Sequence, residues 1–188
     1  DQYFVAAELI GIKALLALNK SDLLDAVALP EFQQRLSRYS AIGYELVTVS
    51  AKQAHGLDPL LESLRGHTNI LVGQSGVGKS SLINALIPNQ EAQVGRLSKA
   101  TGLGRHTTST ATLYTLASGG ELIDSPGVRS FRLGRLSRQQ LEQGFRELQP
   151  YIGRCGFGKC AHTTEPDCAV WQMLYVGAID PRRWDSFR

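Results

Sequence analysis

A glycine-rich segment that ends in a lysine and a serine is the part of this sequence best suited to bind phosphate. It lies in NILVGQSGVGKSS, at residues 69–81, and has the pattern G-x-x-x-x-G-K-S. An apolar, strand-like run precedes it and the helix-like SSLINALI follows, which is the context of a P-loop. Backbone N–H groups of such a loop and of the helix N-terminus bind phosphate oxygens. The alternative is a glycine-rich turn that ends in Lys-Ser by chance, which the two flanking elements disfavour. The predicted phosphate-binding residues are Gly73, Gln74, Ser75, Gly76, Val77, Gly78, Lys79, Ser80 and Ser81.

The base of the nucleotide would be read nearer the start of the chain. ALLALNKSDLL places an N-K-x-D sequence, typical of guanine-nucleotide proteins, directly after a strand-like run. The Asp22 carboxylate would accept hydrogen bonds from the N1–H and the exocyclic amine of guanine, which adenine does not offer. A second strand-like run, ELVTVSAK, ends in an S-A-K sequence that would offer a backbone N–H to the guanine carbonyl. The predicted guanine-binding residues are Asn19, Lys20, Ser21, Asp22, Ser50, Ala51 and Lys52.

Residues for Mg²⁺ and the γ-phosphate follow the P-loop. GELIDSPGV supplies a D-x-x-G sequence with Asp124 and Gly127. Asp124 would hold Mg²⁺ through water, with Ser80 as a direct ligand, and the Gly127 N–H would contact the γ-phosphate. The preceding GRHTT offers Thr107 and Thr108 as candidates for the threonine that closes over Mg²⁺. Lys79 would contact the β- and γ-phosphates.

The order of these loops indicates a circular permutation. GTPases usually run from the P-loop through D-x-x-G to N-K-x-D and S-A-K, whereas here the last two come first. GLDPLLESLRG predicts a helix that joins the S-A-K loop to the P-loop strand, and such rejoining is cheap where domain termini lie close together. The alternation of strands and helices predicts an α/β fold, with a mostly parallel P-loop GTPase sheet covered on both faces. A strand at 110–116 and a turn at 118–120 predict a hairpin leading to Asp124.

Two domains are expected from the distribution of motifs. Residues 1–148 would form the permuted GTPase domain and 149–188 a small C-terminal zinc-binding, helical appendage. DQYFVAAELIGI predicts a helix that leads into the N-K-x-D strand. Because a P-loop GTPase normally has one more strand before that helix, we expect the chain to be a fragment whose sheet is one strand short.

The appendage contains a set of metal-binding side chains. Cys155, Cys160, His162 and Cys168 have the spacing C-x4-C-x-H-x5-C, and they include all three cysteines of the chain. Such a set is a full tetrahedral ligand shell for one structural Zn²⁺. The alternative, a disulfide and a free thiol, is disfavoured in the reducing cytosol where P-loop GTPases act. In the helices expected after residue 168, we predict packing roles for Trp171, Leu174 and Tyr175, and partner contacts for Arg182 and Arg183.

The charge of the chain is concentrated near the nucleotide loops. The net charge is +3, but residues 96–138 contain seven Lys and Arg against two acidic residues. A basic face beside a nucleotide switch favours an RNA partner, the alternative being a solvated surface that balances bound triphosphate. No apolar run is long enough for a membrane span, and no signal-peptide pattern is present.

Together, the permuted order NKSD, SAK, GQSGVGKSS, GRHTT and DSPG and the cysteine-histidine spacing resemble the bacterial ribosome small-subunit-dependent GTPase A family. The resemblance covers essentially the whole chain. It implies GTP and GDP as ligands with Mg²⁺ and one Zn²⁺, and a role in late maturation of the small (30S) ribosomal subunit. It also implies contact with 16S rRNA, hydrolysis stimulated by the subunit, and an N-terminal OB-fold, which we expect to be missing here. A cytoplasmic monomer without membrane attachment is expected.

The catalytic group for GTP hydrolysis is not the usual one. Many GTPases orient water with a Gln after D-x-x-G, whereas this position is Val128. We therefore expect slow intrinsic turnover and name His106 as the catalytic candidate, as the resemblance also does; a packing or RNA-contacting role for His106 is the alternative. Two other functions stay open, an RNA-binding module whose nucleotide is mainly structural and a P-loop ATPase.

Overall fold

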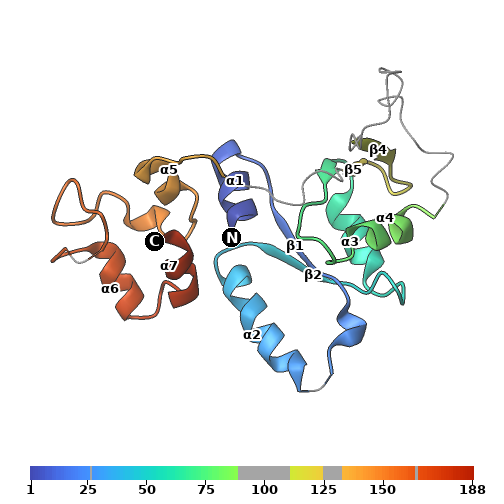
Figure 1. The fold of residues 1–188 in the computed structure, drawn as a ribbon, viewed down its shortest axis with the longest axis horizontal. Helices are drawn as coiled ribbons and strands as arrows, with labels where there is room; N and C mark the ends of the chain where they lie inside the picture. The colour runs from blue at the N-terminus through green and yellow to red at the C-terminus, as the bar shows by residue number, and fades with distance from the viewer. Residues whose placement is uncertain (26, 89–110, 125–132, 164) are drawn as a thin grey trace. The chain divides into compact units, whose positions relative to one another are not determined.

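The computed structural model describes residues 1–25, 27–88, 111–124, 133–163 and 165–188. They fall into two compact units, whose elements are labelled in Figure 1. The sheet unit consists of residues 15–36 and 45–130, and the helical unit consists of residues 1–14, 37–44 and 131–188. Helix α2 (Ala28–Ala41) contributes residues to both units.

The sheet unit contains short strands, each followed by a loop or a helix. Its remaining elements are β1 (Leu15–Leu18), η1 (Ser21–Leu23), β2 (Glu45–Thr48), α3 (Leu57–Leu64), β3 (Thr68–Ile70), α4 (Lys79–Leu86), β4 (Thr112–Thr115) and β5 (Glu121–Asp124). The α/β class, the joining helix after the S-A-K sequence and the hairpin before Asp124 are confirmed.

The strands pair in two separate sheets rather than in the one expected. Strands β1 and β2 are parallel, with Leu15 opposite Glu45. Strand β5 lies between β3, to which it is parallel, and β4, to which it is antiparallel. Among the described strands, no hydrogen-bonded pairing joins the two sheets. The loops that follow β1 and β3 are instead joined by hydrogen bonds from side chains of the first loop to the backbone of the second.

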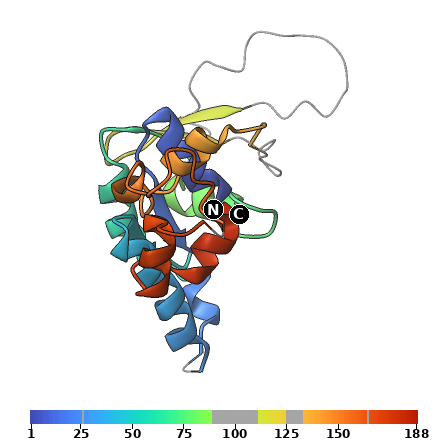
Figure 2. The same cartoon turned by 90° about the vertical axis from the view of Figure 1, so that its left-hand side faces the viewer.

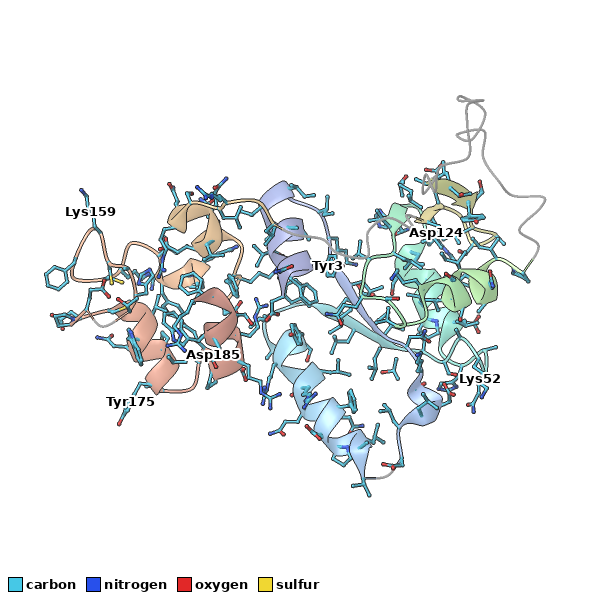
Figure 3. All side chains as sticks on the ribbon, in the orientation of Figure 1. Tyr3, Lys52, Asp124, Lys159, Tyr175 and Asp185 are labelled. Carbon is cyan, nitrogen blue, oxygen red and sulfur yellow. The ribbon has the colours of Figure 1, made fainter. Side chains whose placement is uncertain are left out.

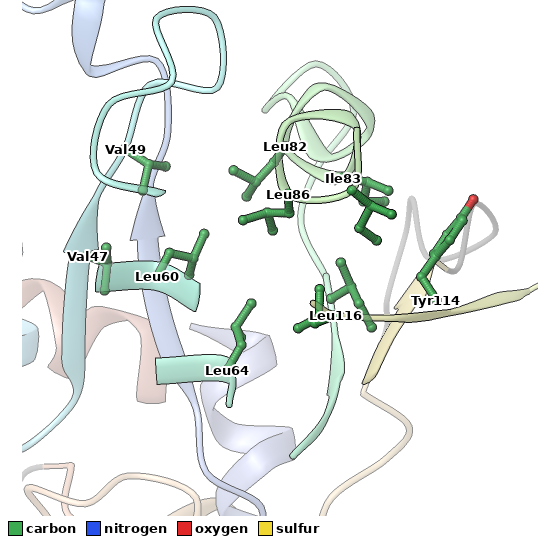
Figure 4. Packing of buried hydrophobic residues seen from close by; sticks show 11 residues of the cluster. Val47, Val49, Leu60, Leu64, Leu82, Ile83, Leu86, Tyr114 and Leu116 are labelled. Atoms are coloured by element: carbon green, nitrogen blue, oxygen red, sulfur yellow. The ribbon is translucent and has the colours of Figure 1, made fainter. Parts of the chain in front are cut away.

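Apolar side chains of α3 and α4 form the core of the sheet unit together with those of the strands. Figure 4 shows Leu82 and Leu86 of α4 facing Leu60 of α3, with Val49 close by. These side chains are all buried. Burial of each contributes about 1.5–3 kcal/mol to folding, so this core fixes α4 directly behind the P-loop.

The helical unit has its own core. Its elements are α1 (Gln2–Ile10), α5 (Arg138–Gln143), η4 (Gln149–Tyr151), α6 (Ala169–Tyr175) and α7 (Pro181–Phe187). Figures 1 and 2 show α6 and α7 side by side, and the rings of Trp171 and Trp184 lie 5.9 Å apart at their centroids. Val5 of α1 packs in the same cluster as Phe145 and Phe187.

The first helix therefore belongs with the C-terminal residues. Val5 and Ala7 are its buried residues, and Val5 lies in the core of the helical unit. The compact units thus differ from the expected domains, because residues 1–14 and 131–148 group with residues 149–188. The boundary after residue 148 stays a prediction. None of the helices in the described part of the chain is both long and apolar enough to span a bilayer.

Candidate functional site

The P-loop connects β3 to α4. Its last glycine, Gly78, caps α4 with φ +92°, and a Cβ there would lie 2.4 Å from Nδ2 of Asn19. Only glycine fits such a position without moving a neighbour. The ammonium of Lys79 donates to the carbonyls of Gly73 and Gln74, at 2.7 and 2.9 Å. Ser80 and Ser81 follow in the first turn of α4. The loop is thus closed on itself by its own lysine, with the start of a helix beside it.

Two side chains of the N-K-x-D sequence bind the P-loop directly. Nδ2 of Asn19 donates to the carbonyl of Val77 at 3.1 Å and more weakly to that of Gly78 at 3.4 Å. Nζ of Lys20 donates to the carbonyl of Gly76 at 2.6 Å. Lys20 itself has φ +64°, a left-handed backbone conformation that costs a non-glycine residue about 1–3 kcal/mol. These bonds position the two loops relative to each other, although they lie far apart in the sequence.

The S-A-K sequence completes the arrangement. The side-chain oxygen of Asn19 accepts from the N–H of Ala51 at 3.2 Å. The hydroxyl of Ser50, which is 0% exposed, donates to Oδ1 of Asp22 at 2.6 Å. Ser50 Oγ also accepts from the N–H of Gln53 at 3.1 Å. The carboxylate of Asp22, predicted to read guanine, is thereby held in one orientation by a buried neighbour.

A tight turn behind Ser50 keeps this loop in place. The N–H of Ser50 donates to the carbonyl of His55 at 2.9 Å, and the N–H of His55 donates to the carbonyl of Ser50 at 3.1 Å. The next residue, Gly56, has φ +71°, and a Cβ there would lie 2.2 Å from the carbonyl oxygen of Thr48. Lys52 is exposed at the surface of this loop (Figure 3). No described contact tests the role predicted for Lys52.

The predicted Mg²⁺ residue Asp124 lies at the same end of the sheet as the P-loop. It is the last residue of β5, whose parallel neighbour β3 places Ile70 opposite Ile123. Figure 3 labels Asp124 at this position. The other residues predicted around the γ-phosphate lie outside the described residues: His106, Thr107, Thr108 and Gly127. Their roles stay predictions.

The helical unit brings the four predicted metal ligands together. The ligand atoms of Cys155, Cys160, His162 and Cys168 all lie within 4.8 Å of one another. The sulfur atoms of Cys155 and Cys168 are 3.9 Å apart, and Nδ1 of His162 lies 3.4 and 3.3 Å from them. Zinc bond lengths and a tetrahedral angle give edges of about 3.8 Å between sulfurs and about 3.5 Å between sulfur and nitrogen. The donor set and its spacing therefore fit a tetrahedral Zn²⁺.

The cysteines are free thiols, and their surroundings favour a cation. None of the three is in a disulfide in this structure. Burial raises the pKa of the Cys160 thiol to about 12. Burial also lowers the pKa of His162, which favours the neutral imidazole that ligates metals. A Cys160 thiolate at neutral pH needs a positive charge beside it, and a bound metal ion supplies that charge.

The loop around His162 is held by a carboxylate that the sequence did not single out. His162 has φ +56°, an uncommon conformation for a side chain of this size. Glu165 accepts from the N–H groups on either side of it, those of Ala161 and Thr163, at 2.7 and 2.8 Å. These two bonds stabilise the turn that directs the imidazole toward the sulfurs.

Comparison with known proteins identifies the family. A family model described as "RsgA GTPase" matches residues 1–134. This chain belongs to the RsgA GTPase family. Two proteins named "Small ribosomal subunit biogenesis GTPase RsgA", from Chromohalobacter salexigens and Ectopseudomonas mendocina, are 51% and 49% identical to it over 188 residues. Each alignment covers all of this chain and 55% of the relative. The RsgA-family chain thus spans about half the length of these curated relatives.

Solved structures agree with this assignment. The crystal structure of YjeQ from Thermotoga maritima superposes with a TM-score of 0.80 at 31% identity, over 99% of this chain and 61% of that one. The crystal structure of "YloQ, a circularly permuted GTPase" gives a TM-score of 0.77 at 28% identity, over 99% of this chain and 58% of that one. The family and the permuted fold expected from the motifs are therefore confirmed for the RsgA-family chain.

Two predictions about the C-terminal residues of this RsgA-family chain were wrong. Arg183, expected to contact a partner, is 3% exposed and bonds both carboxylate oxygens of Glu147, at 2.6 and 3.1 Å. Tyr175, expected to pack, is 90% exposed and projects outward in Figure 3. Both errors arise because helix phase, set by packing against Phe145 and Phe187, decides which side chains of a short helix are buried.

Proposed function

We propose that this chain binds GTP and GDP with Mg²⁺ at the loops of the sheet unit and hydrolyses GTP. The observation that carries the proposal is the network in which Asn19 binds both the P-loop and Ala51 while Ser50 holds Asp22. A phosphate-binding loop and a guanine-reading carboxylate are useful together only if their relative positions are fixed. The bonds of Asn19 and Ser50 supply that fixed arrangement.

The roles within the site follow from the chemistry of each group. Asp22 would pair with the guanine N1–H and amine, which excludes adenine. Lys79 would neutralise the β- and γ-phosphates, and Ser80 and Asp124 would hold Mg²⁺, one directly and one through water. When bound, Mg²⁺ would offset the charge that develops on the transferred phosphoryl group.

The remaining roles are proposed for residues of the two segments near the γ-phosphate. Gly127 would contact the γ-phosphate, and Thr107 or Thr108 would close over Mg²⁺. His106 would act on the attacking water, because Val128 cannot. Replacing His106 by Ala is expected to lower turnover with GTP affinity nearly unchanged, and unchanged turnover would remove His106 from the mechanism.

We also propose that Cys155, Cys160, His162 and Cys168 hold one structural Zn²⁺. The metal would have four protein ligands and no open position for water, so it would brace the fold rather than perform chemistry. It would link the loop of the first two cysteines to the start of α6, since Cys168 caps that helix. Such a link suits a unit with a small apolar core.

The biological role we propose is maturation of the small (30S) ribosomal subunit, as the names of the relatives state for those proteins. The partners would be that subunit and its 16S rRNA, in the cytoplasm and with the protein as a monomer. The excess of Lys and Arg over residues 96–138 supports an RNA partner. Nucleotide state would then control docking, as in other GTPase switches.

The test is GTP turnover by the chain with and without purified small subunits, with ATP and the variant Asp22→Asn as controls. Stimulation with GTP only, lost in Asp22→Asn, is the expected result. Equal turnover of ATP would overturn the guanine assignment. RNA affinity that is the same with GDP and with a non-hydrolysable GTP analogue would favour the RNA-binding module with a structural nucleotide.

A further inference from the structure

A buried carboxylate outside the cysteine-histidine set lies against the metal centre. Glu142 is on α5, and its side chain is 12% exposed. Its Oε1 lies 3.3 Å from Nε2 of His162 and accepts from Nε of Arg138 at 3.2 Å. This places Glu142 beside a predicted metal ligand without making it a ligand.

The two nitrogens of the His162 ring have different partners. Nδ1 lies among the sulfurs, 3.4 Å from Cys155 and 3.3 Å from Cys168. Nε2 faces away from the sulfurs, toward the carboxylate of Glu142. A neutral imidazole carries one proton, and the carboxylate, which only accepts, selects Nε2 as its site. Nδ1 is then left with the lone pair that a metal requires.

We propose that Glu142 is a positioning residue for the metal centre: its carboxylate accepts Nε2–H of His162, so that Nδ1 is presented to the metal. The inference rests on the zinc assignment made above. Carboxylate–histidine–metal chains of this kind fix the ring orientation and increase the basicity of the ligating nitrogen. The signal was absent from the sequence because Glu142 lies outside the C-x4-C-x-H-x5-C pattern.

The alternative is that Glu142 serves only as the partner of Arg138, four residues earlier on α5. Such helix pairs contribute about 0.3–0.5 kcal/mol when exposed, and they give no reason for burying the carboxylate. Arg138 is tied to the metal loop in its own right, because it also donates to the carbonyl of Ala161 and lies over the ring of Phe187, 4.4 Å from its centroid. Arg138 and Glu142 therefore both connect α5 to the turn that carries His162.

The local structure of α5 supports the same role. A capping box formed by Ser137 and Gln140 fixes the start of the helix. A fixed start also fixes the direction in which Glu142 projects, which is toward the metal loop. Glu147, five residues further on, is equally buried but bonds Arg183 instead. The chain thus offers two buried carboxylates in one unit, of which one contacts His162 and the other does not.

The experiment compares Glu142→Gln and Glu142→Ala with Glu147→Gln in the full chain, using competition with a chromophoric chelator to measure the Kd for Zn²⁺. We expect Glu142→Ala to raise this Kd about 10–100-fold and Glu142→Gln, which keeps an accepting oxygen, to raise it less. Glu147→Gln removes a buried carboxylate charge that contacts Arg183 and not His162, so it controls for general destabilisation of the unit and should raise the Kd less than Glu142→Ala does.

A spectroscopic measurement separates positioning from general destabilisation. With Co²⁺ in place of Zn²⁺, Glu142→Ala should alter the visible ligand-field bands, and Glu147→Gln should leave them as in the unmodified chain. If Glu142→Ala has the same Kd and spectrum as Glu147→Gln, the positioning role is wrong and the zinc site stands. If the unmodified chain binds less than one Zn²⁺ per molecule at saturation, the zinc assignment itself fails and the inference fails with it.

Discussion

The hydroxyl of Ser50 donates a 2.6 Å hydrogen bond to Oδ1 of Asp22, and the two residues come from different loops of the sheet unit. Ser50 is completely buried, so this hydroxyl does not exchange its partner for water. One carboxylate oxygen of Asp22 is thereby held in place. If Asp22 reads guanine as proposed, its orientation depends on Ser50, a residue that need not touch the base.

Ser50→Ala should therefore weaken GTP binding. Hydrogen bonds to charged groups contribute about 1.5–3 kcal/mol, so we expect a rise in the Kd for GTP on the order of tenfold. Titration calorimetry with GTP and GDP measures it. A Kd equal to that of the unmodified chain would mean that Asp22 is oriented without Ser50.

Ser118→Ala is the matched control and a prediction in its own right. Ser118 Oγ is buried and has no hydrogen-bond partner among the described residues. Removing an unsatisfied hydroxyl should raise the free energy of unfolding by about 1 kcal/mol, with nucleotide affinity unchanged. Urea denaturation measures the free energy, and a loss of stability would indicate a partner for this hydroxyl.

Substitutions at two P-loop glycines should separate backbone strain from a steric clash. Gly76 and Gly78 both have positive φ, +82° and +92°. A Cβ on Gly76 meets no described atom within 4 Å, whereas a Cβ on Gly78 would lie 2.4 Å from Asn19 Nδ2. Gly76→Ala should cost about 1 kcal/mol of stability from strain alone, and Gly78→Ala should cost more and also break the Asn19 bonds.

Thermal unfolding and GTP titration of the two glycine variants check this expectation. Gly78→Ala should lose GTP affinity to a greater extent than Gly76→Ala. Equal losses in both variants would mean that the contact with Asn19 does not hold the P-loop in its binding conformation.

Removal of the proposed Zn²⁺ should loosen the helical unit. Cys155, Cys160 and Cys168 pack in or against its core. Without the metal, their thiols and the imidazole of His162 would no longer be cross-linked to one another. Both tryptophans of the chain, Trp171 and Trp184, lie in this unit. A chelator should shift their fluorescence emission to the red and lower the Tm, and added Zn²⁺ should reverse both. An unchanged Tm would argue against a structural metal.

The stability of the chain should fall at alkaline pH through Tyr44. Burial is the main cause that raises the pKa of Tyr44, and the adjacent Glu8, which accepts from its hydroxyl at 3.2 Å, adds to the shift. The folded state therefore holds this proton more tightly than the unfolded state does. The raised pKa therefore contributes fully to the free energy of unfolding below about pH 10, the ordinary tyrosine pKa. This contribution is lost as the pH rises further.

Tyr44→Phe tests this prediction, because it removes the titrating group and keeps the ring in its tilted contact with Phe4. The free energy of unfolding should decline less steeply above about pH 10 in Tyr44→Phe than in the unmodified chain. If the free energy of unfolding falls equally steeply with pH in both proteins, groups other than Tyr44 cause the loss of stability at alkaline pH.

The sequence by itself determined which residues are candidates for the chemistry of the two sites. The P-loop, N-K-x-D, S-A-K and cysteine-histidine patterns are local, and each needs particular residue types at a fixed spacing, so residues such as Lys79 and Cys155 could be named from their neighbours. The permuted order of the loops could also be predicted from the sequence, since it depends on the order of motifs along the chain and not on packing.

Only the tertiary structure decided how these patterns support one another. Asn19 and Val77 are bonded although they are 58 residues apart. The contact of Glu142 with His162 joins the cysteine-histidine loop to a helical residue that belongs to no motif. The burial of Arg183 was missed for the same reason. Such contacts depend on strand register, helix phase and packing, which are set by the whole core, and no short stretch of sequence carries that information.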